Sequence, residues 1–197
     1  MDPRAAATPS IRNFAQAIDR QRQRLERIPL LDSTRADVVA AAQALDEAEA
    51  AALALAGGDL PALAGVARAV GIPLLRADAL AEEYRIYESR TAGADAVFLR
   101  ADALPQEVLA RLVQAATSTH MAACVACASA DEVSRAAAAR APVIALPPAL
   151  LHLPVPPRTL VLALSFSPEV RGRADAALDS SLGDADSFRR ALGEEDR

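Results

Sequence analysis

The stretch Ile72–Leu104, IPLLRADALAEEYRIYESRTAGADAVFLRADAL, contains one complete unit of strand, helix and strand. A short apolar run that ends at Leu74 and Leu75 predicts the first strand. Residues 81–91 are rich in helix-forming residues and end before Gly93, and residues 95–99 form a second apolar run. A unit of about 30 residues with this order joins two parallel strands through a right-handed crossover.

The rest of the chain repeats this alternation. Further strands are expected at residues 28–32, 51–55, 121–127, 143–146, 159–164 and 174–178. Helices are expected at residues 10–26, from 37 into the strand near 51, and at 59–70, 105–116, 129–139 and 186–192. This order predicts a parallel sheet covered by helices. An open doubly wound sheet and a closed barrel fit the period equally well.

Two helices are expected to be shortened or missing. Residues 147–157 contain five prolines, so a sixth helix is lost or reduced to a turn. Between Ser167 and Gly172 there is room for about one helical turn only. We also expect a flexible tail at residues 1–9 and one domain at residues 10–197.

Composition excludes several classes of protein. The chain of 197 residues carries a net charge of −5, which does not favour a nucleic acid or an anionic membrane as a partner. No apolar run approaches the ~18 residues of a membrane span, and no signal peptide is visible behind the N-terminus. A cytoplasmic protein of a bacterial type is the expectation.

The central unit also carries a resemblance to a known family. It resembles the third strand, third helix and fourth strand of indole-3-glycerol-phosphate synthase, a (β/α)8 barrel of tryptophan biosynthesis. The matching residues are Leu75, Arg76 and Asp78, then Tyr84, Ile86, Tyr87, Glu88 and Arg90, then Ala92, Gly93, Ala94, Asp95, Ala96 and Val97. The resemblance implies a reduced (β/α)8 TIM barrel with an extra N-terminal helix, although such barrels are typically ~250 residues long.

The acid–base positions that the resemblance implies hold other residues here. The lysine position on strand three is Ala77, and the glutamate position on strand five is Ala126. The remaining family positions fall on Thr34 (strand-one lysine), Pro147 and Ala149 (after strand six) and Leu164 (strand-seven glutamate). Methyl, pyrrolidine and isobutyl groups do not transfer protons, so no catalytic residue is predicted.

The phosphate site implied by the family is also altered. One glycine position is Phe166 and another is Asp179, whose charge opposes a phosphate, while Ser181 matches a family serine. A phosphorylated small molecule is therefore not expected. A residual pocket is predicted from five polar residues: Asp32, Arg76, Asp78, Ser165 and Ser181. Arg76 and Asp78 are interpreted first as a structural ion pair, and second as ligand-binding groups.

Cys124 and Cys127 form a Cys-x-x-Cys string inside an expected strand. Residues three apart in a strand point to opposite faces, so a disulfide is not expected. No metal and no cofactor are predicted, and both cysteines are interpreted as small buried residues of a reducing compartment.

These observations lead to the hypothesis of a non-catalytic pseudoenzyme of this lineage, a protein-binding, scaffold or regulatory module. The proline-rich segment carries four apolar residues: Leu150, Leu151, Leu153 and Val155. They either cover the place of the missing helix or present a surface to a protein partner or a second copy. The alternatives are a small-molecule sensor that keeps the barrel pocket and, third, an active synthase with relocated catalytic residues.

Overall fold

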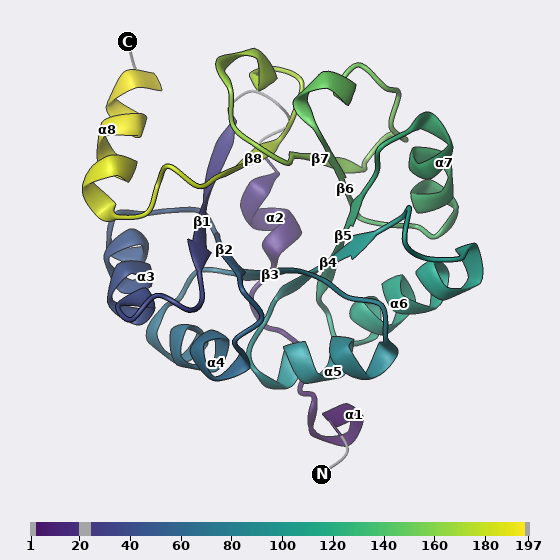
Figure 1. Ribbon diagram of the computed structural model, residues 1–197, viewed down its shortest axis with the longest axis horizontal. Coiled ribbons are helices and arrows are strands. Elements are labelled where there is room, and N and C mark those ends of the chain that lie inside the picture. Colours follow the sequence, from purple (N-terminus) through teal and green to yellow (C-terminus); the bar gives the residue numbers. More distant parts are fainter. Residues whose placement is uncertain (1–2, 20–24, 196–197) are drawn as a thin grey trace.

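The computed structural model describes residues 3–19 and 25–195, and its centre is a closed barrel of parallel strands in the order β1 to β8 (Figure 1). Residues 20–24, where the expected first helix would continue, lie outside the described residues. The strands are β1 (Glu26–Asp32), β2 (Leu53–Ala56), β3 (Leu74–Ala79), β4 (Ala96–Arg100), β5 (Ala122–Ala126), β6 (Val143–Leu146), β7 (Leu160–Ala163) and β8 (Ala176–Asp179). Pairing of Glu26 with Ala176 joins β1 to β8 and closes the barrel. The expected fold class is confirmed.

Helices alternate with the strands and form the outer ring. They are α3 (Val38–Glu47), α4 (Leu60–Ala69), α5 (Glu83–Thr91), α6 (Gln106–Ser118), α7 (Ala130–Ala138) and α8 (Ala185–Glu195). Local chemistry sets several of their starts: the Asp59 carboxylate accepts the Ala62 N–H at 2.9 Å, and the Ser129 hydroxyl accepts the Glu132 N–H at 3.2 Å.

Single 3₁₀ turns replace the sixth and seventh helices of the ring. They are η1 (Pro148–Leu150) and η2 (Pro168–Val170). Prolines that lack an N–H account for the first replacement. Leu151 is buried, and the neighbouring half-buried Leu150, Leu153 and Val155 pack against the same core cluster. The segment therefore covers the barrel where a helix is missing, which is the first of the two expected roles.

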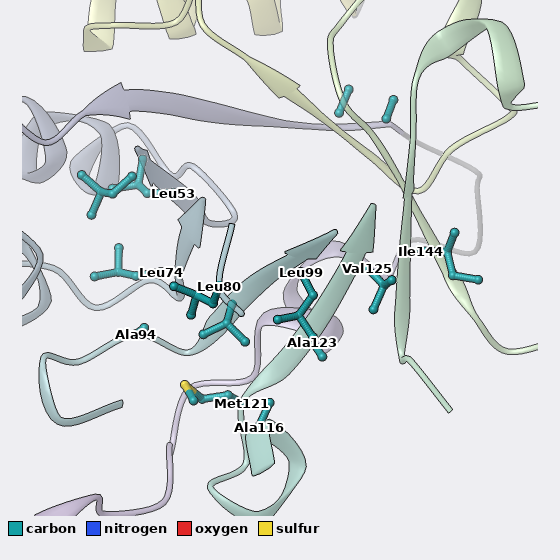
Figure 2. Close-up of a cluster of buried hydrophobic side chains, with 14 of the residues drawn as sticks. Leu53, Leu74, Leu80, Ala94, Leu99, Ala116, Met121, Ala123, Val125 and Ile144 are labelled. Atoms are coloured by element: carbon teal, nitrogen blue, oxygen red, sulfur yellow. The ribbon is translucent and has the colours of Figure 1, made fainter. Parts of the chain in front are cut away.

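The core has two layers. The outer layer lies between strands and helices, and Figure 2 shows part of it, including Leu53, Leu74, Leu99, Val125 and Ile144. The inner layer fills the barrel with residues from alternate strand positions. Six of its members are alanines: Ala52, Ala54, Ala96, Ala122, Ala145 and Ala176.

A short helix, α2 (Phe14–Ile18), lies inside the ring of strands in the view of Figure 1. Phe14 and Ile18 are almost completely buried and belong to the inner layer of the core. The sequence predicts a helix over residues 10–26. Among the described residues of that range, the helix is confined to Phe14–Ile18, and Glu26 already belongs to β1. The expectation failed because Phe14 and Ile18 face the barrel interior and the following chain must enter a strand.

The N-terminal segment is held by a buried carboxylate. Asp95, which is fully buried, accepts the Ser10 hydroxyl at 2.5 Å and pairs with Arg12 at 2.7 Å and Arg90 at 2.8 Å. Its other partner is the Leu74 N–H at 3.0 Å. Before this anchor, Pro3–Ala6 form the helix α1, which packs on α5, within the expected flexible tail.

Candidate functional site

The mouth of the barrel, the end formed by the C-terminal ends of the strands, contains a cavity of about 310 Å³. Its floor is apolar and includes Phe98, Ala126 and Leu164, which pack on the inner layer of the core. Charged groups stand at its wall: Arg100, Asp102 and Glu132. Catalytic groups of this barrel architecture are found at this end of the strands.

Arg100 and Asp102 form a bidentate ion pair. The Arg100 Nε lies 3.0 Å from one Asp102 carboxylate oxygen and its terminal nitrogen lies 2.5 Å from the other. The hydrogen bond from Arg100 lowers the pKa of Asp102, and the same bond raises the pKa of Arg100. Both side chains are exposed, so the pair orients the guanidinium more than it stabilises the fold.

Glu132 reaches the cavity from the first turn of α7. One carboxylate oxygen accepts the Ala128 N–H at 2.8 Å and the other lies 3.3 Å from the Ser129 hydroxyl. The Ser129 hydroxyl in turn accepts the Glu132 N–H, so the arrangement resembles a capping box in which the Ala128 N–H replaces that of the N-cap residue, and it fixes the carboxylate beside the end of β5.

The family's acid–base positions lie in and around this mouth. Ala77, Ala126 and Leu164 pack on the inner layer, and Pro147 lines the cavity. Ala149 is exposed in η1. The sequence analysis therefore predicted several residues at the mouth of the barrel, but it did not predict that Arg100, Asp102 and Glu132 line the cavity there. One signal was present, because the hexapeptide Leu-Arg-Ala-Asp-Ala-Leu of residues 75–80 recurs at residues 99–104.

Three members of the predicted residual pocket come together at the ends of β1, β2 and β3. The Asp32 carboxylate accepts the N–H and the hydroxyl of Thr34, and the hydroxyl bond is the main cause of its lowered pKa. The Asp78 carboxylate accepts the Gly57 N–H at 3.0 Å. Gly57, at φ 99°, is required here because a Cβ would lie 2.9 Å from an Asp32 carboxylate oxygen.

Arg76 and Asp78 pair as expected, with Nε and carboxylate oxygen 3.1 Å apart. Arg76 is buried and also donates to the Ser89 hydroxyl at 2.9 Å, on the helix side of β3. The two residues line a separate cavity of about 380 Å³ beside the start of α5.

Ser165 and Ser181 follow β7 and β8, the strands after which this fold frequently binds phosphate. Ser165 is exposed, and Ser181 donates its N–H at 2.9 Å and its hydroxyl at 2.6 Å to the Asp179 carboxylate. The Phe166 ring packs against the Arg27 guanidinium, whose central carbon lies 3.8 Å from the centre of the ring. None of these residues lines the mouth cavity, so the predicted pocket is divided into two groups.

Both cysteines are free and buried. Cys124, within β5, belongs to the inner layer, and Cys127, directly after β5, belongs to the outer layer, so the two side chains point to opposite faces as expected. Burial raises the pKa of Cys127 to about 12 and also raises that of Cys124. Within the described residues, His, Cys, Asp and Glu side chains do not gather in threes that could hold a metal ion. In the same part of the chain, no helix has the length and apolar character of a bilayer crossing.

The family model of indole-3-glycerol phosphate synthase matches residues 4–147, from α1 to the end of β6. The chain belongs to the indole-3-glycerol phosphate synthase family. The synthase of Kineococcus radiotolerans is 42% identical over 88 residues, which are 45% of this chain and 32% of that protein. The synthase of Rhodococcus jostii is 44% identical over 87 residues, 44% of this chain and 32% of that protein. The chain spans about a third of the length of the curated relatives it matches.

Solved structures share the fold alone. Orotidine 5'-phosphate decarboxylase from Pyrococcus horikoshii OT3 gives a TM-score of 0.67 at 10% identity, over 85% of this chain and 98% of that chain. The YdjI aldolase from Escherichia coli K12 gives a TM-score of 0.61 at 11% identity, over 87% of this chain and 80% of that chain.

These comparisons correct the expected function. The hypothesis of a non-catalytic pseudoenzyme with a scaffold role is contradicted, because the family model and relatives at 40–44% identity favour a synthase. A partner surface on the proline-rich segment stays a prediction: Leu151 is 8% exposed, and its three apolar neighbours are half-buried against the core. Self-association itself stays a prediction.

Proposed function

We propose that this protein is a carboxy-lyase of the indole-3-glycerol phosphate synthase type. It closes a carboxylated anilino sugar into an indole ring and releases carbon dioxide and water. The observation that carries the proposal is the mouth cavity, which combines an apolar floor with one cation and two carboxylates in a chain of this family.

The cavity suits the aromatic end of such a substrate. Phe98 and Leu164 offer apolar surface to a planar ring, and about 310 Å³ accommodates a single ring with substituents. Arg100 stands at the wall with its guanidinium held by Asp102, and a guanidinium is the preferred partner of a planar carboxylate. In this assignment Arg100 binds the carboxylate that is lost as carbon dioxide.

Proton transfer is assigned to Glu132. The family's lysine and strand-five glutamate positions are Ala77 and Ala126, so the wall of the cavity must supply the acid–base group. Glu132 is the carboxylate that both lines the cavity and is held by backbone and hydroxyl donors. Asp102 is committed to Arg100, and its lowered pKa keeps it ionised.

The test is a fluorescence assay for indole formation from the carboxylated anilino sugar, both with and without its phosphate. We expect turnover, a loss of about 10²–10⁴-fold in kcat for Glu132→Gln, and a rise in KM of about tenfold for Arg100→Ala. Gln keeps the capping role, so the fold is preserved. Asp131→Asn, an exposed neighbour on the same helix, is the matched control and should leave kcat unchanged.

Absence of turnover with either compound would refute the proposal. Turnover that Glu132→Gln and Asp131→Asn reduce equally would refute the role of Glu132 alone. The cytoplasm is the proposed compartment, since it keeps free thiols such as Cys124 and Cys127 reduced.

A further inference from the structure

One arginine connects the two charged walls of the mouth cavity. Arg135 lies on α7 three residues after Glu132, so the two side chains leave the same face of the helix. The Arg135 guanidinium donates to the Leu104 carbonyl oxygen, and its Nε donates to the Gln106 side-chain oxygen at 3.3 Å. The Gln106 side-chain nitrogen donates in return to the Arg135 carbonyl oxygen at 3.2 Å. Three hydrogen bonds therefore join α7 to the end of the β4–α6 connection.

This connection carries the other charged wall of the cavity. Arg100 is the last residue of β4 and Asp102 follows it, and both line the cavity together with Glu132. At the far end of the connection, Pro105 stands at the N-cap of α6 and brings no capping side chain. The contacts from Arg135 thus fix the end of this connection to the helix that carries Glu132.

Arg135 acts near the cavity without lining it. It is half-buried and is not among the residues that line the cavity. Burial raises the pKa of Cys127, which does line the cavity, to about 12, and the charge of Glu132 adds to this rise while that of Arg135 opposes it. Both charges therefore lie close to one thiol of the cavity wall, and any effect of Arg135 on a bound substrate passes through its neighbours.

We propose that Arg135 is a positioning residue that sets the spacing of Glu132 and Arg100 across the mouth. The inference rests on the proposed function, in which Arg100 binds the substrate carboxylate and Glu132 transfers the proton. Both groups must reach the same substrate, and a misplacement of about 1 Å can cost on the order of 10²-fold in rate. Carboxylate binding depends on Arg100 and Asp102, which lie on one wall, so it is less sensitive to a shift between the walls.

The experiment measures kcat and KM of wild type and Arg135→Met with the anilino sugar that the wild type turns over. Methionine keeps an apolar stem and removes the donors. We expect kcat to fall about 10–100-fold and KM to stay within about threefold. Arg135→Lys keeps a donor for the Leu104 carbonyl oxygen and should recover most of kcat. Arg111→Met removes the same group from an exposed position of α6 and should keep the wild-type kcat.

Circular dichroism verifies that each variant is folded, which separates positioning from a loss of folded protein. A folded Arg135→Met with the kcat of wild type overturns the inference and leaves the proposed function intact. If Arg135→Met does not fold, Gln106→Met, which removes two of the three hydrogen bonds, takes its place. It should lower kcat several-fold, and a wild-type kcat overturns the inference.

Hydrogen exchange gives a readout that does not depend on turnover. In Arg135→Met, peptides that cover residues 101–108 should exchange about tenfold faster than in wild type, and those of residues 60–69 in α4 should be unchanged. If the wild type turns over no anilino sugar, the proposed function fails, and exchange alone judges Arg135. Equal exchange at residues 101–108 overturns the inference, and faster exchange confined to them supports it.

Discussion

Replacement of Asp95 by alanine is expected to destabilise the protein strongly. The carboxylate is fully buried and joins Ser10, Arg12 and Arg90 to the start of β3. Removing it leaves the buried Leu74 N–H without its 3.0 Å acceptor and two cations without their counter-charge. It also releases the segment that carries α2 into the barrel.

The expected loss in the free energy of unfolding depends on which hydrogen bonds the partners of Asp95 retain. Breaking a buried ion pair on one side costs about 3–5 kcal/mol, and an unsatisfied buried N–H costs about 1–3 kcal/mol. Arg12 retains the carbonyl oxygens of Val70 at 3.1 Å and Gly93 at 2.9 Å, which reduces the loss. We therefore expect about 4 kcal/mol in the free energy of unfolding. At about 2–4 °C per kcal/mol for a chain of this size, Tm should fall by about 8–16 °C.

Urea unfolding followed by circular dichroism measures the free energy, and differential scanning calorimetry measures Tm. Ser10→Ala, which removes one hydroxyl from the network, should cost about 1 kcal/mol. Glu47→Ala, on an exposed side chain at the end of α3, should stay within about 0.5 kcal/mol of wild type. If Asp95→Ala behaves like Glu47→Ala, the carboxylate is not the anchor that its contacts indicate.

Three further predictions concern packing and titration. Leu151→Ala should lower the free energy of unfolding by about 2–4 kcal/mol because this side chain covers the core, whereas Pro154→Ala, at an exposed position, should have little effect; equal stability of the two variants in urea would argue against a covering role. Phe14→Ala should cost about 3–5 kcal/mol by opening the inner layer, and a chemical denaturation midpoint close to wild type would contradict that packing. Burial holds the pKa of Cys127 at about 12, above its ordinary value of 9.0, so the unfolded chain loses this thiol proton first as pH rises. Stability should therefore be retained below pH 9 and fall between pH 9 and 12, and Cys127→Ala should flatten this decline in urea titrations.

The order of strands and helices could be predicted because it depends on local patterns. Strand β6 has the expected bounds, and the helices expected to begin at residues 59 and 129 start directly after Asp59 and Ser129, whose side chains cap them. Closure of the barrel could not be derived from local patterns, because pairing of β1 with β8 joins residues about 150 apart in the sequence, and the resemblance supplied it.

The site was harder to predict for the same reason. Arg27 and Asp179 form an ion pair although they are 152 residues apart in the sequence. The sequence therefore predicts the charge at Asp179 but not its partner. Phe166 stands at a glycine position of the family's phosphate site, a position that does not predict the contact of its ring with Arg27. Each residue alone carries no signal of these contacts, because the closed barrel brings them together.

The repeated hexapeptide Leu-Arg-Ala-Asp-Ala-Leu explains why the cavity in particular was missed. Both copies pair arginine with the aspartate two residues on, at 3.1 Å for Arg76 and 3.0 Å for Arg100. In β3, Leu75 faces the barrel interior, so Arg76 points outward and is buried under α5. In β4, Leu99 packs in the outer layer, so Arg100 takes the inward phase and reaches the mouth. Side chains alternate with a period of two, so a shift of one residue moves the same arginine from the outer layer to the candidate site. The phase is set by neighbouring strands, and identical residues consequently acquire a structural role in one copy and the proposed carboxylate-binding role in the other.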